Sequence, residues 1–171
     1  MFDGFSSLQS INVDSGNPSY TSIDGILFTK NLNSIIRMPA KKTIMEYQIP
    51  KSVISIKSTA FSDCISLQSI DIPNNVTFIG KQAFHSCFSL QSIDIPDSVI
   101  IIENMAFAFC KSLQTIRFHH KEIEKCEIAD NIFEGIDFEQ CTLYIPTGTR
   151  WAYRHHPAFS KFKNIIPERQ A

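Results

Sequence analysis

Three consecutive segments of 23 residues share one pattern, and this repeat constrains the fold more than any other feature. They begin at Ile49, Ile72 and Ile95 and read IPKSVISIKSTAFSDCISLQSID, IPNNVTFIGKQAFHSCFSLQSID and IPDSVIIIENMAFAFCKSLQTIR. The apolar positions stay nearly constant, whereas most positions between them are polar and vary. Stacked coils predict this pattern, because each buried side chain then meets its own equivalent in the next coil.

The spacing within a repeat predicts its local structure. In LQSIDIP, Ile70 and Ile72 alternate with polar residues as in a half-buried strand, and Pro73 closes it. The VISI and VTFI segments predict a second short strand. KSTAFSDC has the spacing of a short helical turn, with Ser58 or Thr59 as its N-cap. Each coil should therefore contain two strands and one helical turn, with successive major strands parallel.

Composition limits the class of protein. Of 171 residues 43% are hydrophobic and the net charge is -1, which does not favour a disordered chain or a nucleic-acid-binding one. No apolar run approaches the ~20 residues that a transmembrane helix needs. The first residues lack the features of a signal peptide, yet they resemble the second half of a repeat. We therefore expect the natural chain, with any secretion signal, to begin upstream.

The five cysteines predict packing rather than cross-linking. Cys64, Cys87 and Cys110 recur every 23 residues, without the close pairs typical of zinc sites. The spacing between neighbouring coils does not exclude a Cys64–Cys87 disulfide, but side chains in parallel columns lack the required orientation. We expect buried, free thiols.

The pattern IPxxVxxIxxxAFxxCxxLxxIxIP, from Ile49 to Pro73 and twice more, resembles the BspA-type leucine-rich repeat of bacterial, Bacteroides-like cell-surface proteins. Residues 17–50 are similar to its longer variant unit, with a hairpin at Asp24-Gly25, and residues 141–165 to its C-terminal cap. The resemblance implies a leucine-rich repeat solenoid with a parallel β-sheet on one side and short strands and helical turns on the other. A helix from about Thr149 to His156 is expected to form a C-terminal helical cap.

The predicted organisation is a solenoid over residues 1–146 and a cap over residues 147–171. Within the solenoid, residues 14–50 form the variant unit, residues 49–118 the three regular repeats and residues 119–146 an irregular last coil. From Phe118 to Ile145 is 27 residues, so this coil is four residues longer than the others, and charged residues replace its IPxxV turn. We expect residues 119–140 to bulge and to be a contact region.

The outward positions of the major strands form two polar columns, which are the candidate binding residues. The first holds Ser10, Ser69, Ser92 and Thr115, and the second Asn12, Asp71, Asp94 and Arg117. Regularly spaced side chains on a solenoid sheet are a common ligand surface. The alternatives are a merely solvated face, or a calcium ion that bridges Asp71 and Asp94.

The remaining histidine, aromatic and acidic residues do not form a pattern typical of a catalytic or metal site. Adjacent residues diverge on a strand or a helix, so His119-His120 and His155-His156 are not arranged to chelate a metal and are expected on the surface. Trp151, Tyr153 and Arg154 favour cap packing over ligand stacking. Glu103, Glu122, Glu124, Glu127 and Asp130 are scattered. We expect no enzyme, no cofactor and no bound metal.

The resemblance implies a secreted or surface-attached monomer that binds an extracellular protein or glycan, in adhesion or host interaction. The alternative is a structural spacer without a ligand of its own.

Overall fold

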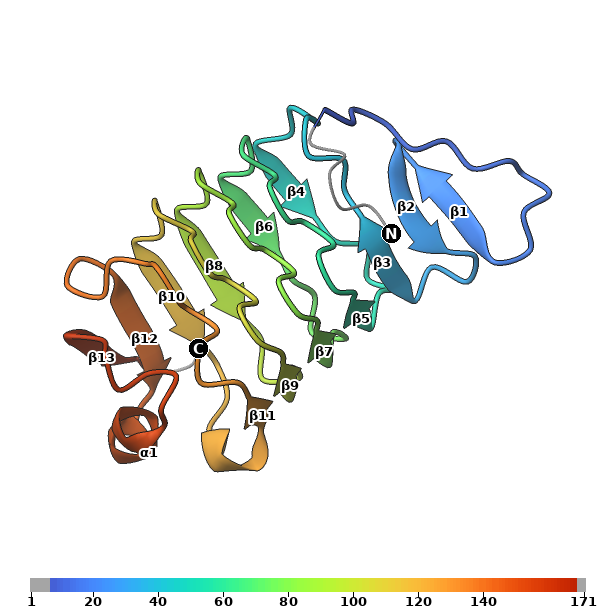
Figure 1. Ribbon diagram of the computed structural model, residues 1–171. Coiled ribbons are helices and arrows are strands. Elements are labelled where there is room, and N and C mark those ends of the chain that lie inside the picture. Colours follow the sequence, from blue (N-terminus) through green and yellow to red (C-terminus); the bar gives the residue numbers. More distant parts are fainter. Residues whose placement is uncertain (1–6, 169–171) are drawn as a thin grey trace.

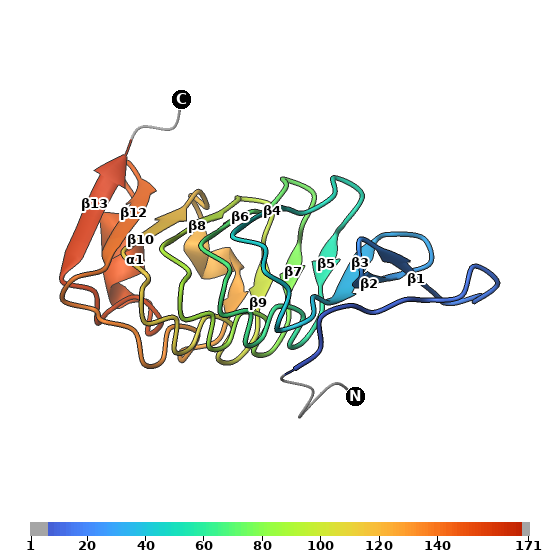
Figure 2. The same cartoon turned by 90° about the horizontal axis from the view of Figure 1, so that it is seen from above.

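The computed structural model describes residues 7–168, so the outer ends of the two predicted ranges, residues 1–6 and 169–171, lie outside it. The chain winds into a solenoid whose successive coils are stacked along one axis (Figure 1). Two rows of strands form two sides of the solenoid, and stacked turns form a third (Figure 2). No helix within residues 7–168 has the length and apolar character to cross a membrane.

The first row contains the predicted major strands, all parallel. Neighbouring rungs pair residues of equivalent sequence position, such as Asp94 with Arg117, which confirms the predicted register. Between the second and third strands of the row, the Gln91 N–H donates to Gln68 O at 3.0 Å. The strands are β4 (Glu46–Gln48), β6 (Ser69–Asp71), β8 (Ser92–Ile95), β10 (Thr115–Phe118), β12 (Thr142–Pro146) and β13 (Asn164–Glu168).

The second row confirms the predicted short strands and begins with the predicted hairpin. Asp24 and Gly25 have φ angles of 50° and 75°, as a tight two-residue turn between antiparallel strands requires. Leu8 to Val13, which resemble part of a repeat, form no strand. The row contains β1 (Tyr20–Ile23), β2 (Ile26–Thr29), β3 (Ser34–Arg37), β5 (Ser55–Ile56), β7 (Phe78–Ile79), β9 (Ile101–Ile102) and β11 (Glu127–Ile128).

The third side corrects one prediction, because its turns are not helical. Thr59 and Asp63 have φ angles of 60° and 61°, which exclude a right-handed helix. N–H groups alternate in direction: Ala60 donates within its turn to Lys57 O at 3.1 Å, whereas Phe61 donates to Ala83 O of the next coil at 2.7 Å. A helix would direct its N–H groups along its own axis, so this backbone instead ties neighbouring coils together.

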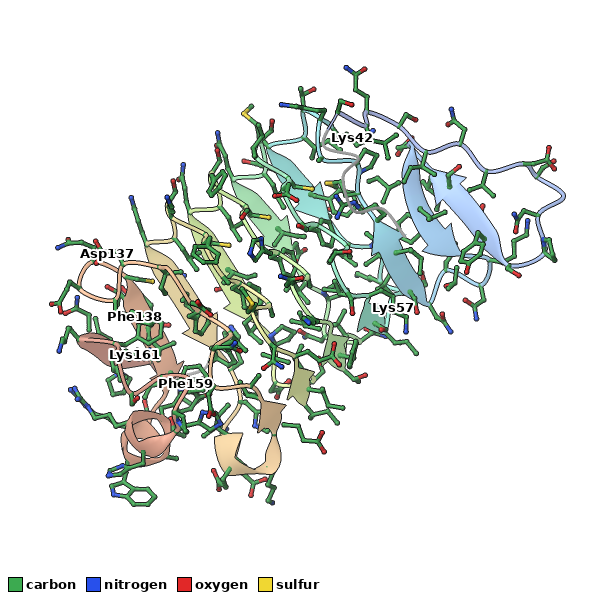
Figure 3. The ribbon with its side chains drawn as sticks, viewed as in Figure 1. Lys42, Lys57, Asp137, Phe138, Phe159 and Lys161 are labelled. Atoms are coloured by element: carbon green, nitrogen blue, oxygen red, sulfur yellow. The ribbon has the colours of Figure 1, made fainter. Side chains whose placement is uncertain are left out.

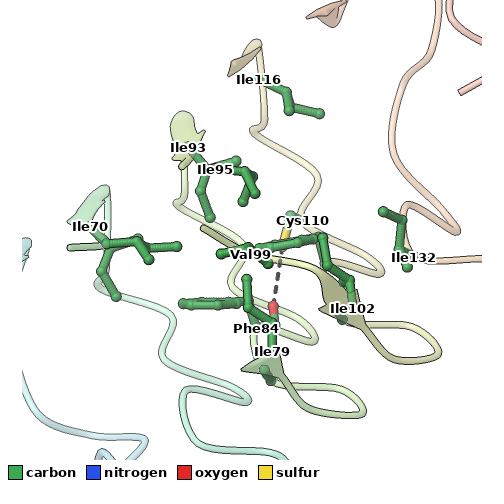
Figure 4. Close-up of a cluster of buried hydrophobic side chains, with 14 of the residues drawn as sticks. Ile70, Ile79, Phe84, Ile93, Ile95, Val99, Ile102, Cys110, Ile116 and Ile132 are labelled. Atoms are coloured by element: carbon green, nitrogen blue, oxygen red, sulfur yellow. Dashed lines mark hydrogen bonds between the residues drawn. The ribbon is translucent and has the colours of Figure 1, made fainter. Parts of the chain in front are cut away.

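Identical side chains stack through the core, as the repeat predicts. Phe61 lies on Phe84 with ring centroids 4.9 Å apart and planes 3° from parallel, and Phe84 lies on Phe107 at 5.1 Å. The cysteine column is buried as expected. Two of its thiols donate to a phenylalanine carbonyl of the preceding coil, Cys87 to Phe61 O at 3.1 Å and Cys110 to Phe84 O at 3.2 Å (Figure 4).

The C-terminal end differs from the predicted helical cap. Its helix α1 (Arg150–His155) is a single turn of six residues, and most of the covering apolar surface comes from the segment that follows it. Phe159, labelled in Figure 3, is buried with Phe162 and Ile165 in the same core cluster as residues of the last coil. Trp151 is 73% exposed and so does not belong to the cap's packing.

Candidate functional site

The six candidate residues lie on three successive major strands. Ser69 and Asp71 come from β6, Ser92 and Asp94 from β8, and Thr115 and Arg117 from β10. The aspartates are exposed, and the hydroxyl residues are half-buried. Ser10 and Asn12 do not join these columns: Ser10 lies close to Gly25, at the hairpin.

Arg117 is the centre of a polar cluster at one end of this face. Its guanidinium lies 3.7 Å from Asp94 Oδ1 and, through Nε, 3.4 Å from Glu168 Oε2. The guanidinium carbon also lies 4.7 Å from the centre of the Tyr144 ring. β10 pairs with β8 on one side and β12 on the other, and β12 pairs with β13, so four adjacent strands supply these side chains. Arg117 therefore contacts side chains from three other strands of the same sheet.

A pocket of about 420 Å³ opens beside this cluster. In the regular coils a proline ends the major strand, but His119 takes its place after β10 and donates its N–H to Ile95 O at 3.1 Å, a bond that proline cannot make. The chain then leaves through the 3-10 helix η1 (Ile123–Lys125). The pocket is lined by Asn74, Pro96, Asp97, Arg117, Phe118, His119, Tyr144, Ile145, Pro146 and Glu168.

The pocket combines hydrogen-bonding groups with an aromatic ring and apolar surface. Its walls offer a donor in Arg117, acceptors in Asp97 and Glu168, and an aromatic ring in Tyr144, over an apolar rim of prolines. Residues 7–168 contain no group of three or more histidine, cysteine or acidic side chains placed to hold a metal ion. Asp94 faces Arg117 rather than only another carboxylate, so the like-charge argument for a bridging calcium ion loses its basis.

Comparison with protein families identifies the repeat. A profile of the BspA type leucine rich repeat region matches residues 39–150 in six copies, which is more than half of the chain. The chain belongs to the BspA-type leucine-rich repeat family. Curated proteins provide no match.

Solved structures of bacterial leucine-rich repeat proteins share this fold. A leucine-rich repeat protein from Eubacterium ventriosum is 24% identical with a TM-score of 0.73, over 94% of this chain and 43% of that one. A leucine rich cell surface protein from Faecalibacterium prausnitzii is 25% identical with a TM-score of 0.55, over 96% and 43%. The pneumococcal vaccine antigen PcpA is 20% identical with a TM-score of 0.63, over 95% and 51%. This BspA-type chain therefore spans about half, or less, of each of these structures.

Sequence reasoning missed two residues of the Arg117 cluster, Tyr144 and Glu168. Tyr144 could have been found, because it stands two residues before Pro146 as Asp71 stands two before Pro73. Glu168 could not, because the segment of β13 has no repeat pattern and its register on β12 is set by the packing of the C-terminal end.

Two of the histidines considered above, His156 and His120, take part in packing or hydrogen bonds at the C-terminal end. His156 is half-buried rather than on the surface: its ring lies 5.2 Å from the Phe159 ring, and burial lowers its pKa. The backbone N–H of Ala158 donates to His156 Nδ1 at 3.2 Å. His120 accepts the Tyr153 hydroxyl at its carbonyl, at 2.8 Å, so it connects the last coil to α1.

Burial raises the pKa values of several cysteine thiols. It raises the pKa of Cys64 to about 12 and that of Cys87 well above its usual value. Thiolates are the reactive form of cysteine, so the column has a packing role. Cys126 is only half-buried, and its pKa is raised to about 11.

Proposed function

We propose that this BspA-type module is a noncatalytic binding domain of a secreted or surface-attached bacterial protein. Its ligand is an extracellular protein or glycan, which it contacts through the outward face of the major-strand sheet, in adhesion or host interaction. Ser69, Asp71, Ser92, Asp94, Thr115 and Arg117 are the proposed contact residues, with Tyr144 and Glu168 added beside them.

The observation that carries the proposal is the Arg117 pocket. A solvated face without a ligand needs no fixed side chains, yet three partners from neighbouring strands hold Arg117 in one orientation. Preorganised polar groups around a concave, partly apolar site are the usual features of ligand recognition. The likeness to a bacterial cell surface protein supports an extracellular location.

A three-site variant tests this choice of face. Asp71→Asn, Asp94→Asn and Arg117→Gln together should abolish saturable capture on an array of glycans and immobilised extracellular-matrix proteins, with the melting temperature unchanged. The matched control is Ile54→Thr with Ile100→Thr, two exposed positions next to strands of the second row. Equal capture by the three-site variant would rule out this face. Absence of saturable binding by the wild-type chain would favour the spacer alternative.

A further inference from the structure

Helix α1 presents an aromatic side chain that the rest of the chain does not use. Trp151 is 73% exposed, and its ring stacks on His155 with centroids 4.4 Å apart. His155 Nδ1 also lies 2.8 Å from Trp151 O, so the indole is held in place from its own helix. Exposed, ordered tryptophans are common anchors of protein interfaces, because little entropy is lost when they bind.

Two arginines share the helix of this tryptophan. Residues 147–168 contain four arginines and lysines against one carboxylate, Glu168, and of these Lys163 lies 4.0 Å from Glu139. Arg150 and Arg154 lie on α1, are exposed, and form no ion pair with any carboxylate between residues 7 and 168.

Negative charge lies in the coil that precedes it. Residues 119–140 contain seven carboxylates against two lysines, spread around that coil, and Glu124 belongs to η1, which α1 contacts. Glu122 is engaged with Lys125 at 2.6 Å, whereas Glu124 and Glu127 are exposed and unpaired within the described part of the chain. The Tyr153 hydroxyl donates to His120 O, and α1 contacts η1. Figure 1 shows α1 and the coil that precedes it at the same end of the solenoid.

The surface has a basic half, α1, and an acidic half, residues 119–140, and together they limit which kind of partner can bind. A polyanion on α1 would pass within a Debye length of the acidic coil, and a polycation on the coil would meet Arg150 and Arg154 in the same way. A suitable partner carries both charges side by side, in the reverse order. A second copy turned about a two-fold axis between the halves meets this condition, because each half then faces its opposite.

We propose that two copies of this chain associate through α1 and the acidic coil, residues 119–140. Arg150 and Arg154 of each chain face Glu124 and Glu127 of the other, and Trp151 supplies the apolar contact. The surface is small, so the dimer is weak and salt-sensitive, and it forms at high local concentration. Its charged residues and Trp151 do not line the Arg117 pocket, and the proposal revises the expectation of a monomer.

Two charge-reversal variants test the proposal by sedimentation equilibrium. One carries Arg150→Glu and Arg154→Glu, and the other Glu124→Lys and Glu127→Lys. The wild-type chain should show a monomer–dimer equilibrium that weakens on the order of tenfold from about 50 to about 500 mM salt. Each variant alone should dimerise at least about tenfold more weakly, because like charges then face each other.

An equimolar mixture of the two variants should dimerise again, to within about threefold of wild type, because opposite charges now meet in both contacts. Melting curves of the variants should match that of wild type, since the four positions are exposed. A wild-type chain that stays monomeric at every concentration, or a mixture that does not associate, would overturn the proposal.

Discussion

The regular coils and the C-terminal end pack their aromatic side chains in different ways. In the regular coils Phe61, Phe84 and Phe107 lie face to face, because each coil repeats the last by a short translation. At the end, Phe133 and Phe162 meet edge to face with an interplanar angle of 88°. A repeated sequence imposes one geometry on every coil, whereas an unrepeated one can build a unique surface.

The same difference applies to the polar face. Ser69, Asp71, Ser92 and Asp94 repeat one motif, whereas Arg117, Tyr144 and Glu168 are three different residues that converge on one pocket. The pocket lies where His119 stands in place of the proline of the regular turn. The side chains that differ from the repeat therefore gather at one place on this face.

The largest expected effect is on the stacked core. Phe84→Ala removes a buried ring with an aromatic neighbour on each side and should lower the free energy of unfolding by about 3–5 kcal/mol. Urea denaturation measures this loss. Phe88→Ala is the control in the same coil, because Phe88 is exposed, and its effect should stay within about 0.5 kcal/mol. Similar losses for the two variants would contradict the stacked geometry.

Two glycines near the C-terminal end test how closely its aromatic side chains pack. Gly135 has a φ of 75°, and an added Cβ would lie 2.4 Å from the Phe109 ring; Gly148 has a φ of 89° with nothing within 4 Å. Gly135→Ala should therefore cost more stability than Gly148→Ala, which introduces only backbone strain of about 1 kcal/mol. Thermal unfolding of both variants measures the difference. Equal costs would mean that Phe109 does not pack closely on Gly135.

The cysteines should react in the order of their burial. Cys126 should be modified first by a thiol-specific reagent, and its rate should rise about tenfold per pH unit toward its pKa of about 11. Cys87 should react only as fast as the chain unfolds, because it is fully buried. Mass spectrometry of partly labelled protein determines the order. Early labelling of Cys87 in folded protein would show that the coils separate locally.

The smallest expected effect is a loss of stability in acid at the C-terminal end. Burial lowers the pKa of His156, so the unfolded chain binds a proton more readily than the folded one. Its contribution is therefore complete above the unfolded pKa of about 6.5 and decreases as pH falls toward the lower folded pKa. Hydrogen exchange of the Phe159 and Phe162 amides between about pH 7 and pH 5 measures it. His156→Gln should reduce this pH dependence; an unchanged profile would assign it to other groups.

The repeat predicted those parts of the fold that the repeat itself determines. The buried columns, the two strands of each regular coil and their register follow from side-chain spacing, since stacking leaves no alternative positions for Phe84 or Cys87. The turns did not follow, because Thr59, Gln82 and Met105 adopt left-handed backbone without glycine, under the demand of hydrogen bonding to the next coil. Arg117 was identified from its place in a column. Its partner Glu168 depends on packing that no repeat encodes.

The central claim, that the Arg117 pocket beside the break in the repeat is the ligand site, is tested most directly by two variants on the same face. Saturable capture on the array of glycans and matrix proteins is measured for Arg117→Gln with Tyr144→Ala, and for Asp71→Asn with Ser69→Ala in a regular coil. The pocket variant should lose at least about tenfold in affinity and the regular-coil variant less than about threefold. A larger loss from the regular-coil variant would contradict the claim.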